Sequence, residues 1–343
     1  MAEQHLRSLI VRLPNPLGDV VMATPLLALL RAGLPEVRIV AAGAEALGPL
    51  LAGSPNLDHF LSLPPAARTG SGSLGRQAHI LRGAQADAVL LLPNSWSSAL
   101  AALRANIPRR VGRRGGGRGL TLTQSLPPIP GPAPMTELYA DFLAPLELAR
   151  PQILPPARLV VTAPAPAPLN DPAQGPWLGV APGAAFGPSK IYPRAALIEA
   201  VSSAAREHGL TPVWIGAPSE VAELTLMAEH VADVLGGPRV VVCGDLGLAK
   251  AAIAACSVLL AMDNGARHMA AALGVPQAVI YGPTHPAWSA HALHQTEIVR
   301  VEGLACLACH KSHCPVKGHP CMHLLPPVQV ASAVGSALRR GRG

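Results

Sequence analysis

Residues 9–27 read LIVRLPNPLGDVVMATPLL, and this stretch decides the fold because a polar turn joins a strand to a helix within it. The apolar run Leu9–Leu13 is typical of a buried strand. Thr24 then offers a helix N-cap, and Pro25 occupies the first helical position. The chain therefore begins with a βα unit.

The same rhythm continues through both halves of the chain. Strands are predicted next at Val37–Ala41 and Ala88–Leu92, and alternating strands and helices indicate right-handed βαβ units in an open parallel sheet. The second half predicts the strands 178–181, 212–215, 240–243, 258–262 and 278–281, and the helices 193–208, 219–235 and 328–338. The predicted fold class is α/β.

A proline-rich stretch separates the two halves. Eight prolines lie between residues 151 and 176, where they remove backbone donors and fix φ. We expect an N-terminal domain over residues 1–160, a linker over 161–176 and a C-terminal domain over 177–343. A chain of 343 residues suits two such domains.

Composition limits the possible protein classes. Half of the residues are apolar and 14% are charged, which excludes a disordered chain. The first eight residues lack the apolar stretch of a secretory signal. The most apolar candidate for a membrane span, Val20–Leu34, is interrupted by Pro25 and Arg31. We expect a soluble protein, or one bound only at a membrane surface.

Positive charge is concentrated in one block. The net charge is +7, and no acidic residue occurs between Ala88 and Thr136. Six arginines fall in this interval: Arg104, Arg109, Arg110, Arg113, Arg114 and Arg118. Such a block suits phosphates of a nucleic acid, a lipid headgroup or a phosphorylated glycan, and a solvated basic loop is the alternative interpretation.

Asp19 is a candidate general base. It is the only acidic residue between Glu3 and Glu36, and it ends the turn that follows the first strand. Ligands of open α/β sheets bind at this edge, where a carboxylate can take a proton from a hydroxyl group. An aspartate before a helix also serves as an N-cap, which is the commoner role.

Three further turns suit a diphosphate. Residues 182–190, PGAAFGPSK, place Lys190 just before a helix N-terminus, although a plain βα loop is the alternative. Residues 263–268, DNGARH, follow another strand, and His268 is either a ligand residue or a core histidine. The turn Gly282–Thr284 ends the next strand. All of these turns converge on one sheet edge.

The chain contains no D-x-D sequence. Because transferases that hold a diphosphate through a divalent metal often use such a pair, we expect Lys190 and helix N-termini to neutralise it here. No metal site and no cofactor are therefore predicted for the reaction.

Four cysteines lie within 16 residues. Cys306, Cys309, Cys314 and Cys321 have spacings that suit zinc or an iron–sulfur cluster, while a transient disulfide or reduced thiols remain open. The other two cysteines, Cys243 and Cys256, are predicted to lie in the core.

Four segments together resemble glycosyltransferase family 9, the ADP-heptose:lipopolysaccharide heptosyltransferases. They are LIVRLPNPLGDVVMATPLL (9–27), GVAPGAAFGPSKIYP (179–193), DNGARHMAAALGVPQAVIYGPTHP (263–286) and CLACHKSHCPVKGHPCM (306–322). The cysteine-rich segment is most similar to the branch that adds the second heptose. The resemblance implies a GT-B fold, in which two Rossmann-like domains with parallel sheets face each other across a cleft.

The resemblance also implies an inverting transfer of heptose from ADP-L-glycero-D-manno-heptose to the inner core of lipopolysaccharide. Asp19 would be the catalytic base. The residues that would bind the donor are Gly183, Lys190, Glu220, Asp263, Asn264, Gly265, His268 and Thr284. Those that would bind the acceptor are Gly18, Arg113, Arg114 and Arg118. The implied acceptor is the lipid A–Kdo core at the inner leaflet, so a cytoplasmic monomer associated peripherally with the inner membrane is expected.

Two departures from the family pattern concern the donor site. Asn264 and Ala266 stand where the family has Ser/Thr and Leu/Pro, and Ile191-Tyr192 stands where it has Arg/Gln-Trp. They leave open a GT-B transferase or epimerase acting on another nucleotide sugar. A non-catalytic binder is disfavoured because Asp19, Lys190 and Asp263 are retained. A nucleic-acid-binding module is also disfavoured, because few aromatic residues are available for base stacking, and no nucleic-acid partner is expected.

Overall fold

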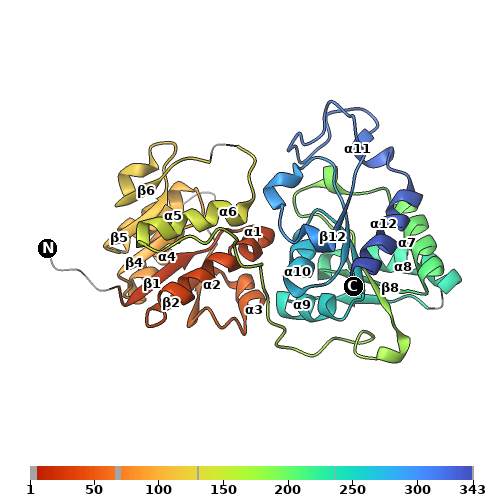
Figure 1. Ribbon diagram of the computed structural model, residues 1–343, viewed down its shortest axis with the longest axis horizontal. Coiled ribbons are helices and arrows are strands. Elements are labelled where there is room, and N and C mark those ends of the chain that lie inside the picture. The colour runs from red at the N-terminus through yellow and green to blue at the C-terminus, as the bar shows by residue number, and fades with distance from the viewer. Residues whose placement is uncertain (1–5, 66–70, 130, 236, 342–343) are drawn as a thin grey trace. The chain divides into compact units, whose positions relative to one another are not determined.

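The computed structural model describes residues 6–65, 71–129, 131–235 and 237–341. The chain forms two compact units, Met1–Ala157 and Arg158–Gly343, and each is an α/β structure of its own (Figure 1). The predicted linker, residues 161–176, belongs to the second unit. Just before it, the backbone N–H of Leu159 donates to the carbonyl oxygen of Ala272 over 3.2 Å.

The first unit is built on a six-stranded parallel sheet. Its strands have the order β3-β2-β1-β4-β5-β6. Their bounds are β1 (Ser8–Arg12), β2 (Arg38–Ala44), β3 (His59–Leu63), β4 (Ala88–Leu91), β5 (Arg109–Arg113) and β6 (Gln124–Leu126). All five residues of β1 are buried, as the apolar run predicts for a central strand.

Helices complete the first unit. They are α1 (Leu17–Met22), α2 (Thr24–Gly33), α3 (Gly48–Leu51), α4 (Ser71–Gly83), α5 (Trp96–Arg104) and α6 (Met135–Ala140). One sheet face packs on α4 and α5, where Ile10, Val89 and Leu91 meet Leu81 and Ala99 in one apolar cluster.

The second unit repeats this topology. Its strand order, β9-β8-β7-β10-β11-β12, is again that of a Rossmann sheet, with every pair parallel. The strands are β7 (Trp177–Ala181), β8 (Thr211–Gly216), β9 (Val240–Val242), β10 (Val258–Met262), β11 (Gln277–Ile280) and β12 (Thr296–Val299).

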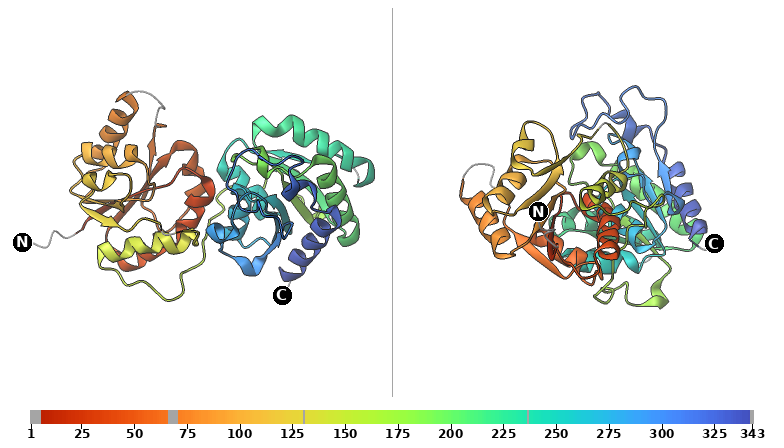
Figure 2. Two further views of the ribbon diagram at one scale, coloured as in Figure 1. Left: turned by 90° about the horizontal axis from the view of Figure 1, so that it is seen from above. Right: turned by 60° about the vertical axis from the view of Figure 1, so that its left-hand side comes forward.

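The helices of the second unit are α7 (Arg194–His208), α8 (Val221–Leu235), α9 (Leu246–Ala254), α10 (Gly265–Leu273), α11 (Pro320–His323) and α12 (Pro327–Arg340). Helix α7 (green) lies against both α8 and the dark blue C-terminal helix α12 (Figure 2). Leu197, Leu224 and Val334 from these helices pack on Val180 and Leu260 of the sheet. None of the helices in the described part of the chain has the length and apolar character needed to cross a bilayer.

The predicted strands are all present, within a residue or two of the predicted ends for all but β2, which runs three residues further, to Ala44. Strands β3, β5, β6 and β12 were not predicted, because polar or charged residues break their apolar pattern. The helix predicted over residues 219–235 begins two residues later than predicted, at Val221. A short 3₁₀ turn, Pro218–Glu220, precedes that helix, and the Glu220 carboxylate accepts from the backbone N–H of Ala217 over 2.8 Å.

Topology places the candidate turns. In each sheet the chain reverses its strand order beside the first strand of the unit, next to β1 in the first unit and next to β7 in the second. Ligands of doubly wound sheets bind at this switch point. The turn with Asp19 follows β1, the turn with Lys190 follows β7, and Asp263 follows β10, which neighbours β7.

Candidate functional site

Asp19 lies in the first turn of α1 but does not cap it. The N-cap position is Pro16, and no side-chain cap bond is present. No described residue donates a hydrogen bond or ion pair to the Asp19 carboxylate, so the N-cap interpretation is wrong for this residue. Burial raises its pKa to about 6. Burial, and then the charge of Asp19, raise the pKa of Tyr139 on α6.

The arginine block is divided between buried and exposed positions. Arg113 is 5% exposed and donates to the carbonyl oxygens of Pro127 and Leu138 and to the Asp141 carboxylate. Arg114 is exposed. Gly18, the other predicted acceptor residue, lies half-buried in α1. A solvated basic loop therefore does not describe Arg113.

Arg118 is buried without a full set of partners. It is 1% exposed, and its Nη1 donates to Pro93 and Asn94 over 2.8 and 3.4 Å. Its Nε and Nη2 atoms have no hydrogen-bond partner in the described part of the chain. Burial lowers the pKa of Arg118. An incompletely paired guanidinium inside a protein is costly, which makes this side chain a candidate for function.

In the second unit, three of the predicted donor residues meet at one carboxylate. Lys190 Nζ donates to the Oδ2 atom of Asp263 over 2.7 Å and to its carbonyl oxygen over 2.6 Å. The Thr284 hydroxyl donates to the same Oδ2 over 2.5 Å, and Arg267 Nε lies 3.5 Å from Oδ1. The turns after β7, β10 and β11 therefore converge as predicted.

Charge pairing controls the protonation of Asp263. Burial alone would raise its pKa, but the charges of Lys190 and Arg267 outweigh this effect, together with hydrogen bonds from Lys190 and Thr284. The pKa is lowered as a result. Asp263 thus remains ionised near neutral pH, and the ammonium of Lys190 is held at the switch point.

Asn264 holds two strand ends together. Its Nδ2 donates to the carbonyl oxygens of Ala181 and Gly183 over 2.9 and 2.7 Å. Its Oδ1 accepts from the backbone N–H groups of Ala266 and Arg267, so it caps α10. Gly265 is the first residue of that helix. The side chain of Asn264 is therefore a structural bridge between the β7 and β10 turns.

Gly183 allows a close approach to Glu220. A Cβ atom at residue 183 would lie 1.8 Å from Glu220 Oε1, so only glycine fits beside that carboxylate in this arrangement. Glu220 is half-buried. The two predicted donor residues are thus in direct contact.

His268 is buried and paired with His291. Its Nδ1 lies 2.9 Å from His291 Nε2. Burial, followed by the Arg267 charge, lowers both pKa values, that of His291 to about 3, so both rings are neutral near pH 7. His291 Nδ1 is buried and unpaired within the described part of the chain. Because an unpaired N–H costs more than an unfilled lone pair, the arrangement favours a proton on His291 Nε2 that is donated to His268.

This pairing sets the tautomer of His268. With Nδ1 accepting, the neutral ring carries its proton on Nε2 and can donate it to a ligand oxygen. Sequence reasoning missed His291, since it belongs to no recognisable motif and lies 23 residues from its partner.

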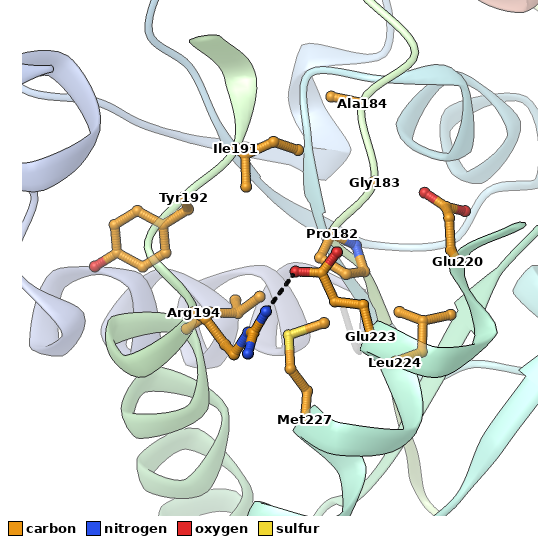
Figure 3. A pocket seen from close by; sticks show the side chains of 11 residues that line it. Pro182, Gly183, Ala184, Ile191, Tyr192, Arg194, Glu220, Glu223, Leu224 and Met227 are labelled. Atoms are coloured by element: carbon orange, nitrogen blue, oxygen red, sulfur yellow. Dashed lines mark hydrogen bonds and ion pairs between the residues drawn. The ribbon is translucent and has the colours of Figure 1, made fainter. Parts of the chain in front are cut away.

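A pocket of about 230 Å³ opens beside Gly183 and Glu220 (Figure 3). An ion pair of 3.3 Å between Arg194 and Glu223 lies on its wall. Its remaining lining comes from the β7 turn and the facing sides of α7 and α8: Pro182, Ala184, Ile191, Tyr192, Leu197, Leu224 and Met227. Because the packing of α7 against α8 creates this pocket, no sequence motif predicts it.

None of the six cysteines, all of which lie in the described part of the chain, forms a disulfide. Within the described residues, no three His, Cys, Asp or Glu side chains are arranged to hold a metal ion. Burial raises the pKa of Cys321 to about 11, and the three neighbouring cysteines, Cys314, Cys306 and Cys309, contribute to the rise. Cys243 and Cys256 are buried, as predicted.

Comparison with known proteins identifies relatives along nearly the whole chain. The sequence profile of glycosyltransferase family 9 (heptosyltransferase) matches residues 74–319. Lipopolysaccharide heptosyltransferase 2 of Salmonella typhimurium is 28% identical over 312 residues, which cover 84% of this chain and 86% of that protein. The Escherichia coli K12 protein of the same name is 28% identical over 315 residues, with the same shares covered.

Solved structures show the same fold. The E. coli ADP-heptose lipopolysaccharide heptosyltransferase II has a TM-score of 0.76 at 23% identity and covers 98% of this chain and 100% of its own. A family 9 glycosyltransferase from Veillonella parvula DSM 2008 has a TM-score of 0.81 at 18% identity, with 97% of each chain covered. These likenesses and the two parallel sheets confirm the predicted α/β, GT-B fold class.

Proposed function

The chain belongs to glycosyltransferase family 9, the heptosyltransferases, and from that premise we propose that it transfers heptose from ADP-L-glycero-D-manno-heptose to the inner core of lipopolysaccharide. One structural observation supports this proposal most strongly. Lys190 and Thr284 converge on Asp263 at the switch point of the second sheet, where a nucleotide diphosphate is expected.

The donor would be bound by residues of this cluster. The Lys190 ammonium neutralises the negative charge that develops on the departing diphosphate, and Asp263 accepts hydrogen bonds from the sugar hydroxyls. His268 donates from Nε2, and the Thr284 hydroxyl, whose proton is donated to Asp263, accepts a hydrogen bond from the sugar. The buried ion pair between Lys190 and Asp263 supports this assignment, because it keeps the ammonium fixed before the donor arrives.

The nucleoside would lie near Glu220. Its carboxylate accepts from a ribose hydroxyl, and Gly183 leaves the backbone bare where the nucleotide passes. Gly265 contributes at the start of α10. The Oδ1 atom of Asn264 already accepts hydrogen bonds from the backbone N–H groups of Ala266 and Arg267. The role of Asn264 is therefore to shape the donor site rather than to bind phosphate through its side-chain amide.

Asp19 would be the catalytic base. An unpaired carboxylate with a pKa of about 6 is a stronger base than an ordinary aspartate, yet at pH 7 it is still about ten times more often ionised than protonated. It takes the proton of the acceptor hydroxyl while that oxygen attacks the anomeric carbon from the face opposite the diphosphate. The configuration at that carbon is therefore inverted.

The acceptor would be the anionic lipid A–Kdo core at the inner leaflet, bound by Gly18, Arg113, Arg114 and Arg118. The unpaired Nε and Nη2 atoms of Arg118 support a carboxylate or phosphate partner. A cytoplasmic monomer at the membrane surface, acting without a divalent metal, completes the proposal.

A different nucleotide sugar is the alternative donor. The departures from the family pattern favour no particular one, since Asn264 is used as a structural bridge and the Tyr192 hydroxyl donates to the carbonyl oxygen of Leu325 over 2.7 Å. A donor screen decides between ADP-heptose and another nucleotide sugar. The enzyme is supplied with lipid-linked core and a panel of nucleotide sugars, and the nucleoside diphosphate that is released is identified. Release from ADP-heptose alone is expected, and release only from another donor would overturn the proposal.

A further inference from the structure

The cysteine-rich segment, residues 306–323, lies directly against two turns of the proposed donor site. One turn, Pro188–Lys190, carries the ammonium, and the other, Gly282–His285, carries the Thr284 hydroxyl. Neither turn is part of a long helix or a strand, so regular structure alone does not fix their side chains.

Ser189 is bound on every polar atom by this segment. Its backbone N–H donates to the carbonyl oxygen of Ser312 over 3.1 Å, and its hydroxyl donates to that of Lys311 over 2.6 Å. Its own carbonyl oxygen accepts from His319 Nε2 over 2.9 Å. Ser189 is 2% exposed. The residue next to Lys190 is therefore held entirely by chain more than 120 positions away.

The second turn is held in the same way. The backbone N–H of Ala308 donates to the carbonyl oxygen of Gly282 over 3.3 Å. The backbone N–H of His310 donates to the carbonyl oxygen of Pro283 over 2.7 Å. His310 Nε2 accepts from the backbone N–H of His285 over 3.3 Å. These three bonds bracket Thr284.

Direct packing accompanies the hydrogen bonds. A Cβ atom at Gly187 would lie 2.6 Å from the carbonyl oxygen of Ser312, and one at Gly282 would lie 3.0 Å from Cys321 Sγ. Both turns thus lie against the segment through bare backbone. A shift of the segment is expected to move both turns.

The segment also holds an uncommon backbone conformation. Ala308, His310 and His319 have φ values of 56°, 54° and 43°, and they are three of the seven non-glycine residues with positive φ in the described part of the chain. Such strain persists only where the surroundings determine it, and it is concentrated at functional sites. Two of the three residues, His310 and His319, are those whose side chains reach the donor turns.

We propose that the cysteine-rich segment is a positioning element for the donor diphosphate, with His319 and His310 as its positioning residues. It holds the ammonium of Lys190 and the hydroxyl of Thr284 at one point, which matters because misplacement by about 1 Å can cost 100-fold in rate. The inference rests on the proposed function only in naming the ligand as a diphosphate.

Two variants of His319 and one control test the proposal in the full-length chain. His319→Ala removes the bond to Ser189. His319→Gln keeps a donor of similar reach. His313→Ala is the matched control, since His313 lies on the same segment, is exposed, and its Nδ1 hydrogen-bonds with the hydroxyl of the adjacent Ser312 over 3.2 Å.

The first measurement is ADP affinity by calorimetry. The dissociation constant is expected to rise about tenfold for His319→Ala, to return to within about threefold of wild type for His319→Gln, and to stay unchanged for His313→Ala. Equal affinity for His319→Ala and wild type would overturn the proposal, as would equal weakening by the control or a failure of glutamine to restore binding.

The second measurement needs no nucleotide. Hydrogen exchange in the peptide covering Pro188–Lys190 is expected to become faster in His319→Ala but not in His313→Ala. If wild type failed to bind ADP, the proposed donor would be wrong, while the exchange rates would still decide the positioning role. Unchanged exchange in His319→Ala would refute it.

Discussion

Replacing Asp19 by asparagine is predicted to slow the enzyme and to stabilise it. The carboxyl has a pKa of about 6 in the fold against 3.8 in a free chain, because burial disfavours its charged form. Below pH 3.8 it is protonated in both states, and the fold loses nothing. Between pH 3.8 and 6 the unfolded chain is already ionised while the folded carboxyl still holds its proton, so stability falls over this interval, and the loss is complete above pH 6.

The full shift corresponds to about 3 kcal/mol of unfolding free energy. This figure is an upper bound, because the half-buried side chain of Asp19 retains some contact with water. Asparagine has nearly the same shape and no charge. At pH 7.5 the Asp19→Asn protein should therefore unfold several degrees higher than wild type, and the difference should vanish below pH 4. Loss of a positioned base should lower kcat about 10²- to 10⁴-fold.

Calorimetric melting at pH 4 and pH 7.5, together with ADP release at saturating donor, measures both effects. Wild-type kcat should itself rise with pH through about 6, as the base becomes ionised. Normal turnover by Asp19→Asn would refute the catalytic role. A variant no more stable than wild type at pH 7.5 would show that the carboxylate is not desolvated, which would remove the physical basis of its raised pKa.

Three further substitutions test the donor site by calorimetry with ADP. Lys190→Gln should weaken ADP binding at least tenfold and leave acceptor binding unchanged, because a hydrogen bond to a charged group contributes about 1.5–3 kcal/mol. Equal ADP affinity of the variant and wild type would exclude the contact between Lys190 and the phosphates. Gly183→Ala should displace the Glu220 carboxylate and weaken ADP binding while leaving the melting temperature nearly unchanged, so unaltered affinity would separate Glu220 from the nucleotide. His291→Ala should weaken ADP binding severalfold by freeing the tautomer of His268, and no change would mean that the pair does not orient a donor.

The sequence predicted the central strands because their burial on both faces demands apolar runs. Leu9–Leu13 and Val258–Met262 are such runs, and both became strands. Strand β5 escaped prediction because its sequence, RRVGR, is three-fifths arginine. Its arginines satisfy backbone carbonyl oxygens, as Arg113 does with Pro127 and Leu138, and no periodicity reveals such partners.

The candidate site was predictable only in part, for a similar reason. Topology brings the turns after parallel strands to one edge, so the meeting of Lys190 with Asp263 follows from their positions in the chain. The pairing of His268 with His291 and the pocket between α7 and α8 depend on side-chain packing over long separations. The hydrogen bonds between Ser189 and the cysteine-rich segment also depend on such packing.

Sugar transfer itself is tested most directly by mass spectrometry of the acceptor. The purified enzyme is incubated with ADP-L-glycero-D-manno-heptose and a lipid-linked inner-core acceptor, and the mass of the acceptor is then measured. A gain of one heptose with one equivalent of ADP released is the predicted result. An acceptor of unchanged mass, from a protein that binds ADP and is folded, would contradict the account.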